Sequence, residues 1–140
     1  MPKKFLIPIL ILLDQVTKLI FWSRDFLLGP LHIHSVPNYG LIFSLNFGLL
    51  TNLLVIILAL GFFIYYYWLN HLNLHSLGKL LFALILAGAL SNFIDRLYLG
   101  YVKDFLDLGL GFTFNLADLM VFSGLIGILL MPSKDKADEF

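Results

Sequence analysis

Residues 49–69 form a run without a charged side chain, and this run constrains the fold more than any other part of the sequence. About 20 mostly apolar residues are needed for a helix to cross the hydrocarbon core of a bilayer. An aromatic cluster, Tyr65-Tyr66-Tyr67-Trp68, stands at one end of the run, as is typical where a helix meets the membrane interface. The run therefore predicts a membrane-spanning helix.

Three further segments have the length and apolar character of spans, residues 5–22, 77–97 and 112–131. The last of them qualifies only if Asp118 lies inside the membrane. Hydrophobic residues make up 60% of the 140-residue chain, which is more than a soluble domain usually contains. We therefore expect an all-α integral membrane protein, with one domain of four transmembrane helices covering residues 1–140.

Composition and short motifs exclude several classes of function. The nine basic and nine acidic residues balance, so no strong field indicates binding to nucleic acid. The absence of cysteine excludes disulfides, thiolate catalysis and cysteine-bound metals. No H-E-x-x-H motif supports a zinc protease. His32 and His34 have a spacing that could bind a metal, but we favour a polar strand face, and we expect no metal and no cofactor.

The basic residues predict the orientation of the four spans. The N-terminus resembles a secretory signal, but no small-x-small cleavage site follows the apolar run, so we expect it to be retained as the first span. One side of the membrane would collect more basic residues, Lys3, Lys4, Lys79, Lys134 and Lys136. Cytoplasmic loops are enriched in lysine and arginine, so both termini are expected in the cytoplasm.

The loop of residues 23–48 would then face outward, together with residues 100–111. Apolar and polar residues alternate at 31–34 and again at 41–47, with a turn signal at 37–40 between them. This pattern predicts a small extracytoplasmic β-rich element, either a hairpin or a sheet fragment lying at the membrane surface.

Charged residues from separate spans are expected to meet at one depth. A helix rise of about 1.5 Å per residue places Lys18 roughly 21 Å along the first span, Asp118 roughly 20 Å along the fourth and Arg96 roughly 26 Å along the third. In a core about 30 Å thick, all three gather in the outer third. Gly100 is a plausible break in the third helix, after which the chain can turn back and bring Asp104 to face Asp118.

Two carboxylates at close range share a proton and titrate as a unit. One can act as general base on water while the other donates a proton, which hydrolyses an amide without metal or cysteine. Other interpretations stay open: Asp104 could form a surface ion pair with Lys103 or Arg96, and Asp118 could cap a helix with Asn115. A proton-relay subunit, a membrane chaperone or a lipid-binding scaffold would also fit the charges.

Other polar and small residues have simpler interpretations. Asp14 and Lys18 are four residues apart in the favourable order and predict an intrahelical ion pair. Asp95, next to Arg96, is most often an interfacial anchor at such a position. Four residues are expected at packing positions between helices, Asn52, Gly88, Gly124 and Gly127.

Several motifs in order resemble those of lipoprotein signal peptidase, also called signal peptidase II. They are L-D-Q-V-T-K at 13–18, N-Y-G-L-I-F at 38–43, S-N-F-I-D-R at 91–96, G-Y-V-K-D-F at 100–105 and F-N-L-A-D at 114–118. Each motif alone is weak, but their order and spacing over nearly the whole chain form a specific signal. The resemblance implies an aspartic endopeptidase that cleaves prolipoproteins just before a diacylglyceryl-modified cysteine.

The resemblance also implies a role for each motif residue. Asp104 and Asp118 would be the catalytic aspartates. The substrate would be bound by Asn38, Asn92, Arg96 and Asn115. The site would be supported by Asp14, Lys18 and the structural aspartate Asp95. Asp107 has no assigned role and is expected in a loop.

The family's location and partners follow in the same way. The resemblance implies a multi-pass protein of the bacterial cytoplasmic (inner) membrane with its active site toward the outer leaflet. We expect a monomer that contacts membrane lipid and binds no nucleic acid. The sequence departs from the family pattern at Leu41 and Ile42, where two alanines are usual, and at Ser91, where glycine is usual.

Overall fold

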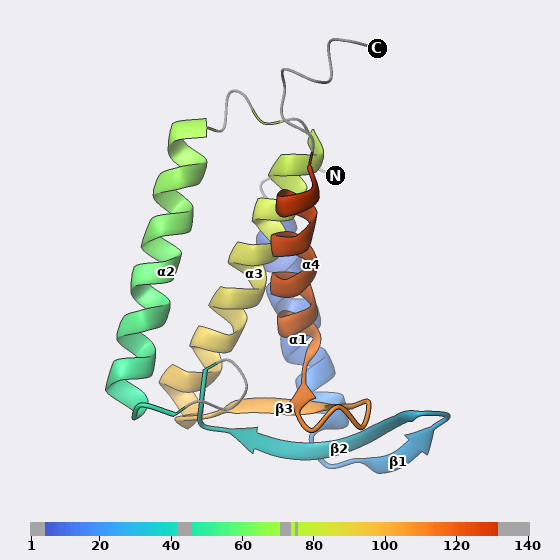
Figure 1. The fold of residues 1–140 in the computed structure, drawn as a ribbon. Coiled ribbons are helices and arrows are strands. Elements are labelled where there is room, and N and C mark those ends of the chain that lie inside the picture. The colour runs from blue at the N-terminus through green and yellow to red at the C-terminus, as the bar shows by residue number, and fades with distance from the viewer. Residues whose placement is uncertain (1–4, 42–45, 71–73, 75, 132–140) are drawn as a thin grey trace.

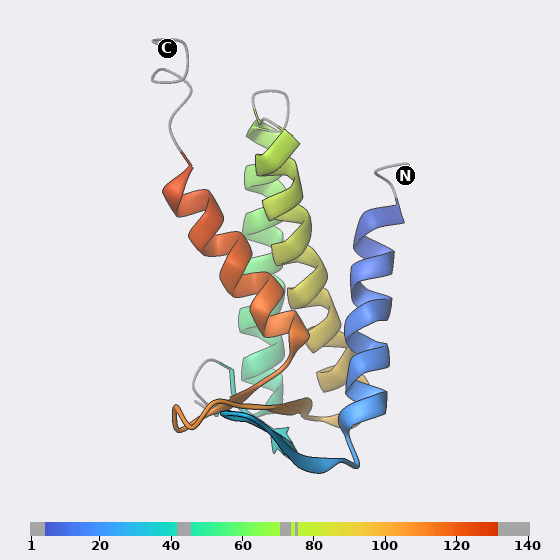
Figure 2. The same cartoon turned by 90° about the vertical axis from the view of Figure 1, so that its right-hand side faces the viewer.

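The computed structural model describes residues 5–41, 46–70, 74 and 76–131. Within these residues the chain forms four helices that lie side by side, α1 (Leu6–Phe21), α2 (Leu49–Asn70), α3 (Ser76–Leu99) and α4 (Leu116–Leu130) (Figure 1). A four-stranded antiparallel sheet lies across one end of the helices, in the order β1 (Asp25–Leu28), β2 (Leu31–Asn38), β3 (Val102–Asp107) and β4 (Thr113–Phe114) (Figure 2). The expected small β-rich element is thus present, and it also includes strands from the second outer loop.

Helix α3 is the centre of the bundle because it packs against each of the other helices. Glycines allow α4 to approach it closely. A Cβ atom on Gly88 would lie 2.3 Å from the carbonyl oxygen of Ala117, and one on Gly124 would lie 2.8 Å from that of Leu81. Small residues at helix contacts are typical of membrane proteins. This close contact holds the start of α4 against α3.

Helix α2 stands apart from α1 and α4 and packs only along α3 in Figure 1. Its main contact is aromatic, because Phe82 of α3 packs on Phe63, Tyr66 and Tyr67. Most of the α2 surface is exposed; of its residues only Asn52 and Leu60 are buried.

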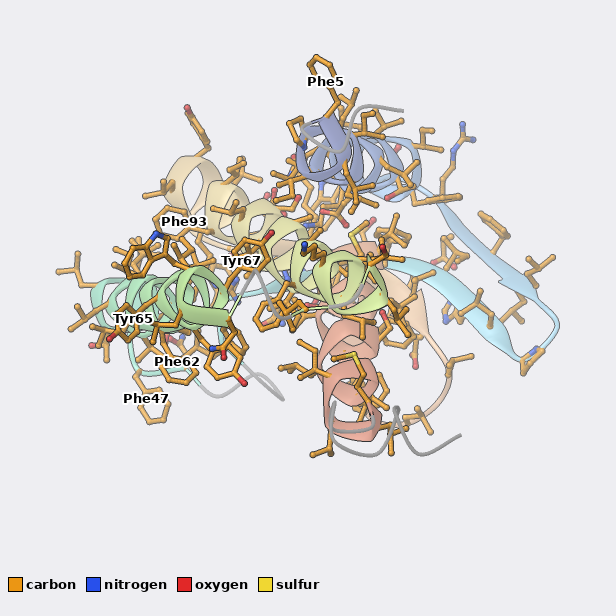
Figure 3. The ribbon with its side chains drawn as sticks, turned by 90° about the horizontal axis from the view of Figure 1, so that it is seen from above. Phe5, Phe47, Phe62, Tyr65, Tyr67 and Phe93 are labelled. Atoms are coloured by element: carbon orange, nitrogen blue, oxygen red, sulfur yellow. The ribbon has the colours of Figure 1, made fainter. Side chains whose placement is uncertain are left out.

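The helices carry apolar side chains on their outward surfaces and enclose several charged ones. The outward surfaces of the helices are apolar; Leu19 of α1 is 67% exposed and Leu129 of α4 is 77% exposed. Phe62 and Tyr65 of α2 likewise point away from the bundle (Figure 3). Polar and charged side chains are buried in the interior beside apolar ones such as Phe82 and Ile85; they include Asp14, Lys18, Asn52, Ser91, Asp95 and Arg96. Such a surface suits hydrocarbon rather than water.

Length and composition alone mark α2 and α3 as long and apolar enough to cross a membrane. Helix α1 has 16 residues, and α4 has 15. Helix α4 begins at Leu116, later than the segment starting at residue 112 that the hydropathy predicts. The reason is local: residues Thr113–Phe114 pair with β3, and Asn115 caps the helix.

Two turns define how the sheet joins the helices. Gly100, with φ of 80°, follows the last residue of α3 and turns the chain into β3, as the expected break requires. Gly29, with φ of 61°, lies between β1 and β2. The predicted turn at 37–40 does not end a hairpin, because β2 continues to Asn38 and pairs there with Val102. The alternation predicted at 41–47 lies largely outside the described residues.

Candidate active site

Asp104 and Asp118 reach the site from different elements. Asp104 lies on β3 and is 1% exposed, whereas Asp118 lies in the first turn of α4 and is partly buried. Burial of the Asp104 carboxyl, followed by the negative charge of Asp118, raises the pKa of Asp104 to about 7. Asp104 has no ion pair among the described residues, so the alternative of a surface pair with Lys103 or Arg96 is wrong.

Asn115 joins the two aspartates. Its Oδ1 accepts the backbone N–H of Asp118 at 3.0 Å, and Oδ2 of Asp118 accepts the backbone N–H of Asn115 at 3.0 Å. This reciprocal capping box starts α4 and fixes the Asp118 rotamer. Because only the amide oxygen serves the cap, Nδ2 remains free to donate to Oδ1 of Asp104 at 2.6 Å. The predicted helix cap and the predicted carboxylate pair are therefore parts of one structure.

Two more asparagines complete the hydrogen bonds of the pair. Nδ2 of Asn92 donates to Oδ1 of Asp118 at 2.7 Å, and Nδ2 of Asn38 donates to Oδ2 of Asp104 at 2.8 Å. Every carboxylate oxygen of the two aspartates thus accepts an N–H. In this structure the amides of Asn92 and Asn115 donate to the aspartates and orient them.

Lys18 lies at the centre of a buried charge network beneath the pair. Its Nζ lies 2.7 Å from Oδ2 of Asp14, 2.9 Å from Oδ2 of Asp95 and 2.8 Å from Oδ1 of Asn92. The predicted pair of Asp14 and Lys18 is therefore present, and Asp95 belongs to the network rather than to the interface. Oδ1 of Asp14 accepts the backbone N–H of Ala117 at 2.8 Å. The network ties α1, α3 and the first turn of α4 together.

Arg96 supports the loop that follows β2. It donates from Nη1 to the carbonyl of Asn92 at 3.2 Å and from Nη2 to the carbonyl of Gly40. Its Nε is buried and has no hydrogen-bond partner among the described residues. Buried polar groups without partners are rare in native proteins. No described residue accepts the Nε hydrogen of Arg96, so this donor is available to a further group.

Asp104 opens onto a cavity of about 200 Å³. The cavity is lined by Val36, Pro37, Asn38, Tyr39, Gly40, Asn46, Asp104 and Thr113. Of the four residues expected to bind substrate, only Asn38 lines it. The sheet and the loop after β2 thus form the walls, and one aspartate forms part of the floor.

Three site residues were not predicted from the sequence. Ser91 donates to Oδ2 of Asp14 at 2.6 Å, and Nε2 of Gln15 donates to Ser91 Oγ and to Oδ1 of Asp95, both at 2.9 Å. Asn52, expected at a helix-packing position, instead donates to the carbonyl of Tyr39 at 2.9 Å and holds the loop beside the cavity. The signal available in the sequence is a single asparagine near the start of an otherwise apolar run.

Comparison with known proteins shows the family of the chain. Residues 6–133 match the family described as signal peptidase (SPase) II. The chain belongs to the signal peptidase II family. It is 35% identical to the lipoprotein signal peptidase of Clostridioides difficile, over 94% of this chain and 97% of that protein. It is 38% identical to that of Microcystis aeruginosa, over 91% of this chain and 88% of that protein.

Solved structures agree with this assignment. One bacterial membrane enzyme has a TM-score of 0.82 at 28% identity and covers 97% of this chain and 90% of its own. A second has a TM-score of 0.74 at 30% identity, with 94% and 92% covered. Signal peptidase II enzymes are aspartic peptidases that remove signal peptides from prolipoproteins, and the chain is a membrane peptidase of this class.

Proposed function

We propose that Asp104 and Asp118 are the catalytic groups of this peptidase and that cleavage occurs just before a cysteine carrying diacylglyceryl. The main support is that two carboxylates, Asp104 on β3 and Asp118 on α4, interact electrostatically, and that Asp104 lines a cavity. A carboxyl with a pKa of about 7 keeps its proton at mildly acidic pH, so the pair can provide an acid and a base together.

The reaction then follows the logic of a shared proton. The Asp118 carboxylate takes a proton from water as the water oxygen bonds to the scissile carbonyl carbon, and Asp104 gives its proton to the carbonyl oxygen. When the tetrahedral intermediate collapses, that oxygen returns its proton to Asp104. Asp118 protonates the leaving nitrogen, and the C–N bond breaks. The products are a carboxylic acid and an amine, and the pair returns to its starting state.

The surrounding residues support this assignment of roles. Asp118 lies at the N-terminus of α4, where the helix dipole and the N–H of Asn115 stabilise a carboxylate against the cost of its burial. Asn38 lines the cavity and can bind substrate backbone from the side of β2. Arg96 can donate its remaining Nε hydrogen to a substrate carbonyl.

We further propose that all four helices span the bacterial inner membrane, with both termini in the cytoplasm. The support is the apolar outer surface of every helix and the location of the sheet at the end of the bundle opposite the described start of α1 and end of α4 (Figure 1). The aspartates then lie toward the outer leaflet, where water can enter beside a lipid-anchored cysteine. One chain supplies both aspartates, which supports a monomer in contact with lipid.

Substrate lipidation is expected to be required for cleavage. A prolipoprotein peptide with a diacylglyceryl-modified cysteine should be cut on its N-terminal side, and the same peptide with a free cysteine should be cut at least about tenfold more slowly, because remote binding energy of the acyl chains is lost. Mass spectrometry of the two fragments measures both the rate and the bond. Equal rates for the two peptides would contradict the proposed substrate, and a cut at another bond would contradict the proposed position.

The pH dependence of cleavage should report the proton of Asp104. Ionisation of a carboxyl whose pKa is about 7 removes the general acid, so kcat/KM should be highest below that pH and fall about tenfold per pH unit above it. A rate measured with the lipidated peptide from pH 5 to pH 9 tests this. The Asp135→Asn variant, changed in the segment that follows α4, is the control and should keep the same profile. A rate that rises through pH 7 would contradict the assignment.

A further inference from the structure

A second cluster of ionisable side chains lies on the sheet, separate from the aspartate pair. His32 and His34 alternate along β2 and therefore share a face. Asp107, expected in a loop, instead ends β3 and pairs in register with His32. The β1–β2 pair, which includes the strand with the two histidines, reaches out beyond the helices (Figures 1 and 3).

The distances between these groups suit a common ligand. Nitrogen atoms of the two histidines and a carboxylate oxygen of Asp107 all lie within 4.8 Å of one another. Nε2 of His34 is 3.2 Å from Oδ2 of Asp107, and the two imidazole rings are 4.3 Å apart. Ligand atoms about 2.1 Å from a tetrahedral zinc ion are roughly 3.4 Å apart, so small side-chain rotations would bring all three onto one ion.

The exposure and chemistry of these three side chains suit the binding of a metal ion from solution. The side chains of His32, His34 and Asp107 are 37%, 27% and 28% exposed, so an ion can reach them without opening the fold. Oδ1 of Asp107 accepts the backbone N–H of Gly109 at 2.7 Å, which holds the carboxylate with its Oδ2 beside His34. Two imidazoles and one carboxylate form a ligand set that zinc prefers over magnesium or calcium.

We propose that His32, His34 and Asp107 bind one Zn²⁺ ion on the extracytoplasmic sheet, with water as the fourth ligand. The ion is structural and takes no part in peptide cleavage. The pairing of β2 with β3 is irregular between Ile33 and Val36, next to His34, so this is the point where a cross-link between the strands has most effect. The two linked strands are also those that carry Asn38 and Asp104 to the cavity.

The function of such an ion would be to fix the walls of the substrate cavity. Asp104 and Asp107 lie three residues apart on β3, and His34 and Asn38 lie four apart on β2. Zinc at one end of this strand pair would limit sliding of the strands at the other end. The contact between Asn38 and Asp104 at 2.8 Å depends on that register.

Zinc titration of the purified, metal-free protein without a histidine tag tests the proposal directly. Calorimetry should show one Zn²⁺ per chain, and Co²⁺ used as a probe should give the visible absorption of a tetrahedral site. His32→Ala, His34→Ala and Asp107→Asn should each weaken Zn²⁺ binding at least about tenfold. The matched control is the double variant His71→Ala/His75→Ala, which removes the two other histidines and should bind as the unchanged protein does.

The possible outcomes separate cleanly. Absence of stoichiometric binding overturns the proposal, as does equal binding by the three ligand variants or loss of binding in the control alone. Without metal, each variant should unfold at the same temperature as the unchanged protein, because the substituted side chains are partly exposed. If a variant unfolds at a lower temperature, His34→Gln is tested in its place. The proposal requires the same loss of Zn²⁺ binding for His34→Gln. The readout does not involve peptide cleavage, so its result stands apart from that of the proposed catalytic roles.

Discussion

Asp104→Asn and Asp118→Asn should each reduce kcat for a lipidated prolipoprotein peptide by at least about a thousandfold. An amide cannot take a proton from water or give one to the scissile carbonyl, and a single remaining aspartate cannot act as acid and base together. The fold should survive, because asparagine has nearly the same shape as aspartate. Rates of fragment formation, measured by mass spectrometry at saturating substrate, give the size of the loss.

Asp135→Asn, which removes a carboxylate in the segment after α4, is the control for these variants and should cleave at the unchanged rate. Thermal unfolding in detergent should show that Asp104→Asn is folded. Its unfolding temperature should also depend less on pH. Because the pKa of Asp104 is raised in the folded state, the free energy of unfolding of the unchanged protein should fall by at most about 1.4 kcal/mol per pH unit as pH rises toward 7. If a variant cleaves at more than a tenth of the unchanged rate, the substituted aspartate is not a catalytic group.

Lys18→Met should produce the largest loss of stability of any single change in the bundle. The substitution keeps the length of the side chain but leaves Asp14 and Asp95 buried without a cation. Breaking a buried charge network by removing one partner costs about 3–5 kcal/mol. We therefore expect little folded protein in the membrane and a much lower unfolding temperature for any that is purified.

The triple variant Lys18→Met/Asp14→Asn/Asp95→Asn tests whether the loss of stability comes from unpaired buried charges or from altered packing. It removes all three charges together, so the unpaired carboxylates of the single variant disappear and much of the stability should return. Cleavage should remain slow, because Lys18 no longer orients Asn92 against Asp118. A single Lys18→Met variant that unfolds at the temperature of the unchanged protein would show that the network does not stabilise the bundle.

Hydropathy and local spacing were sufficient to predict the helices and the parts of the site that are close in sequence. The spans at 5–22, 49–69 and 77–97 differ by no more than two residues at either end from α1, α2 and α3. The ion pair of Asp14 and Lys18 follows from a four-residue spacing on one helix. The Asn115 cap with Asp118 follows from a three-residue spacing at a helix start.

Contacts between distant segments were not predictable in the same way. Ser91 meets Asp14, and Gln15 meets Asp95, only because α1 and α3 pack face to face. The start of α4 was placed too early because hydropathy does not distinguish Phe112 and Phe114 in an extended segment from the same residues in a helix. The role of Asn52 depends on a loop whose path the sequence pattern does not define.

Infrared titration of the carboxyl groups tests most directly whether Asp104 and Asp118 share a proton. In detergent or lipid, the unchanged protein should show the C=O band of a protonated carboxyl that disappears as pH rises through about 7. This band should weaken in Asp104→Asn, which removes its carboxyl, and in Asp118→Asn its midpoint should move to lower pH because the neighbouring negative charge is gone. A protein with no protonated carboxyl between pH 5 and pH 7, or a band unchanged in both variants, would contradict the shared-proton mechanism.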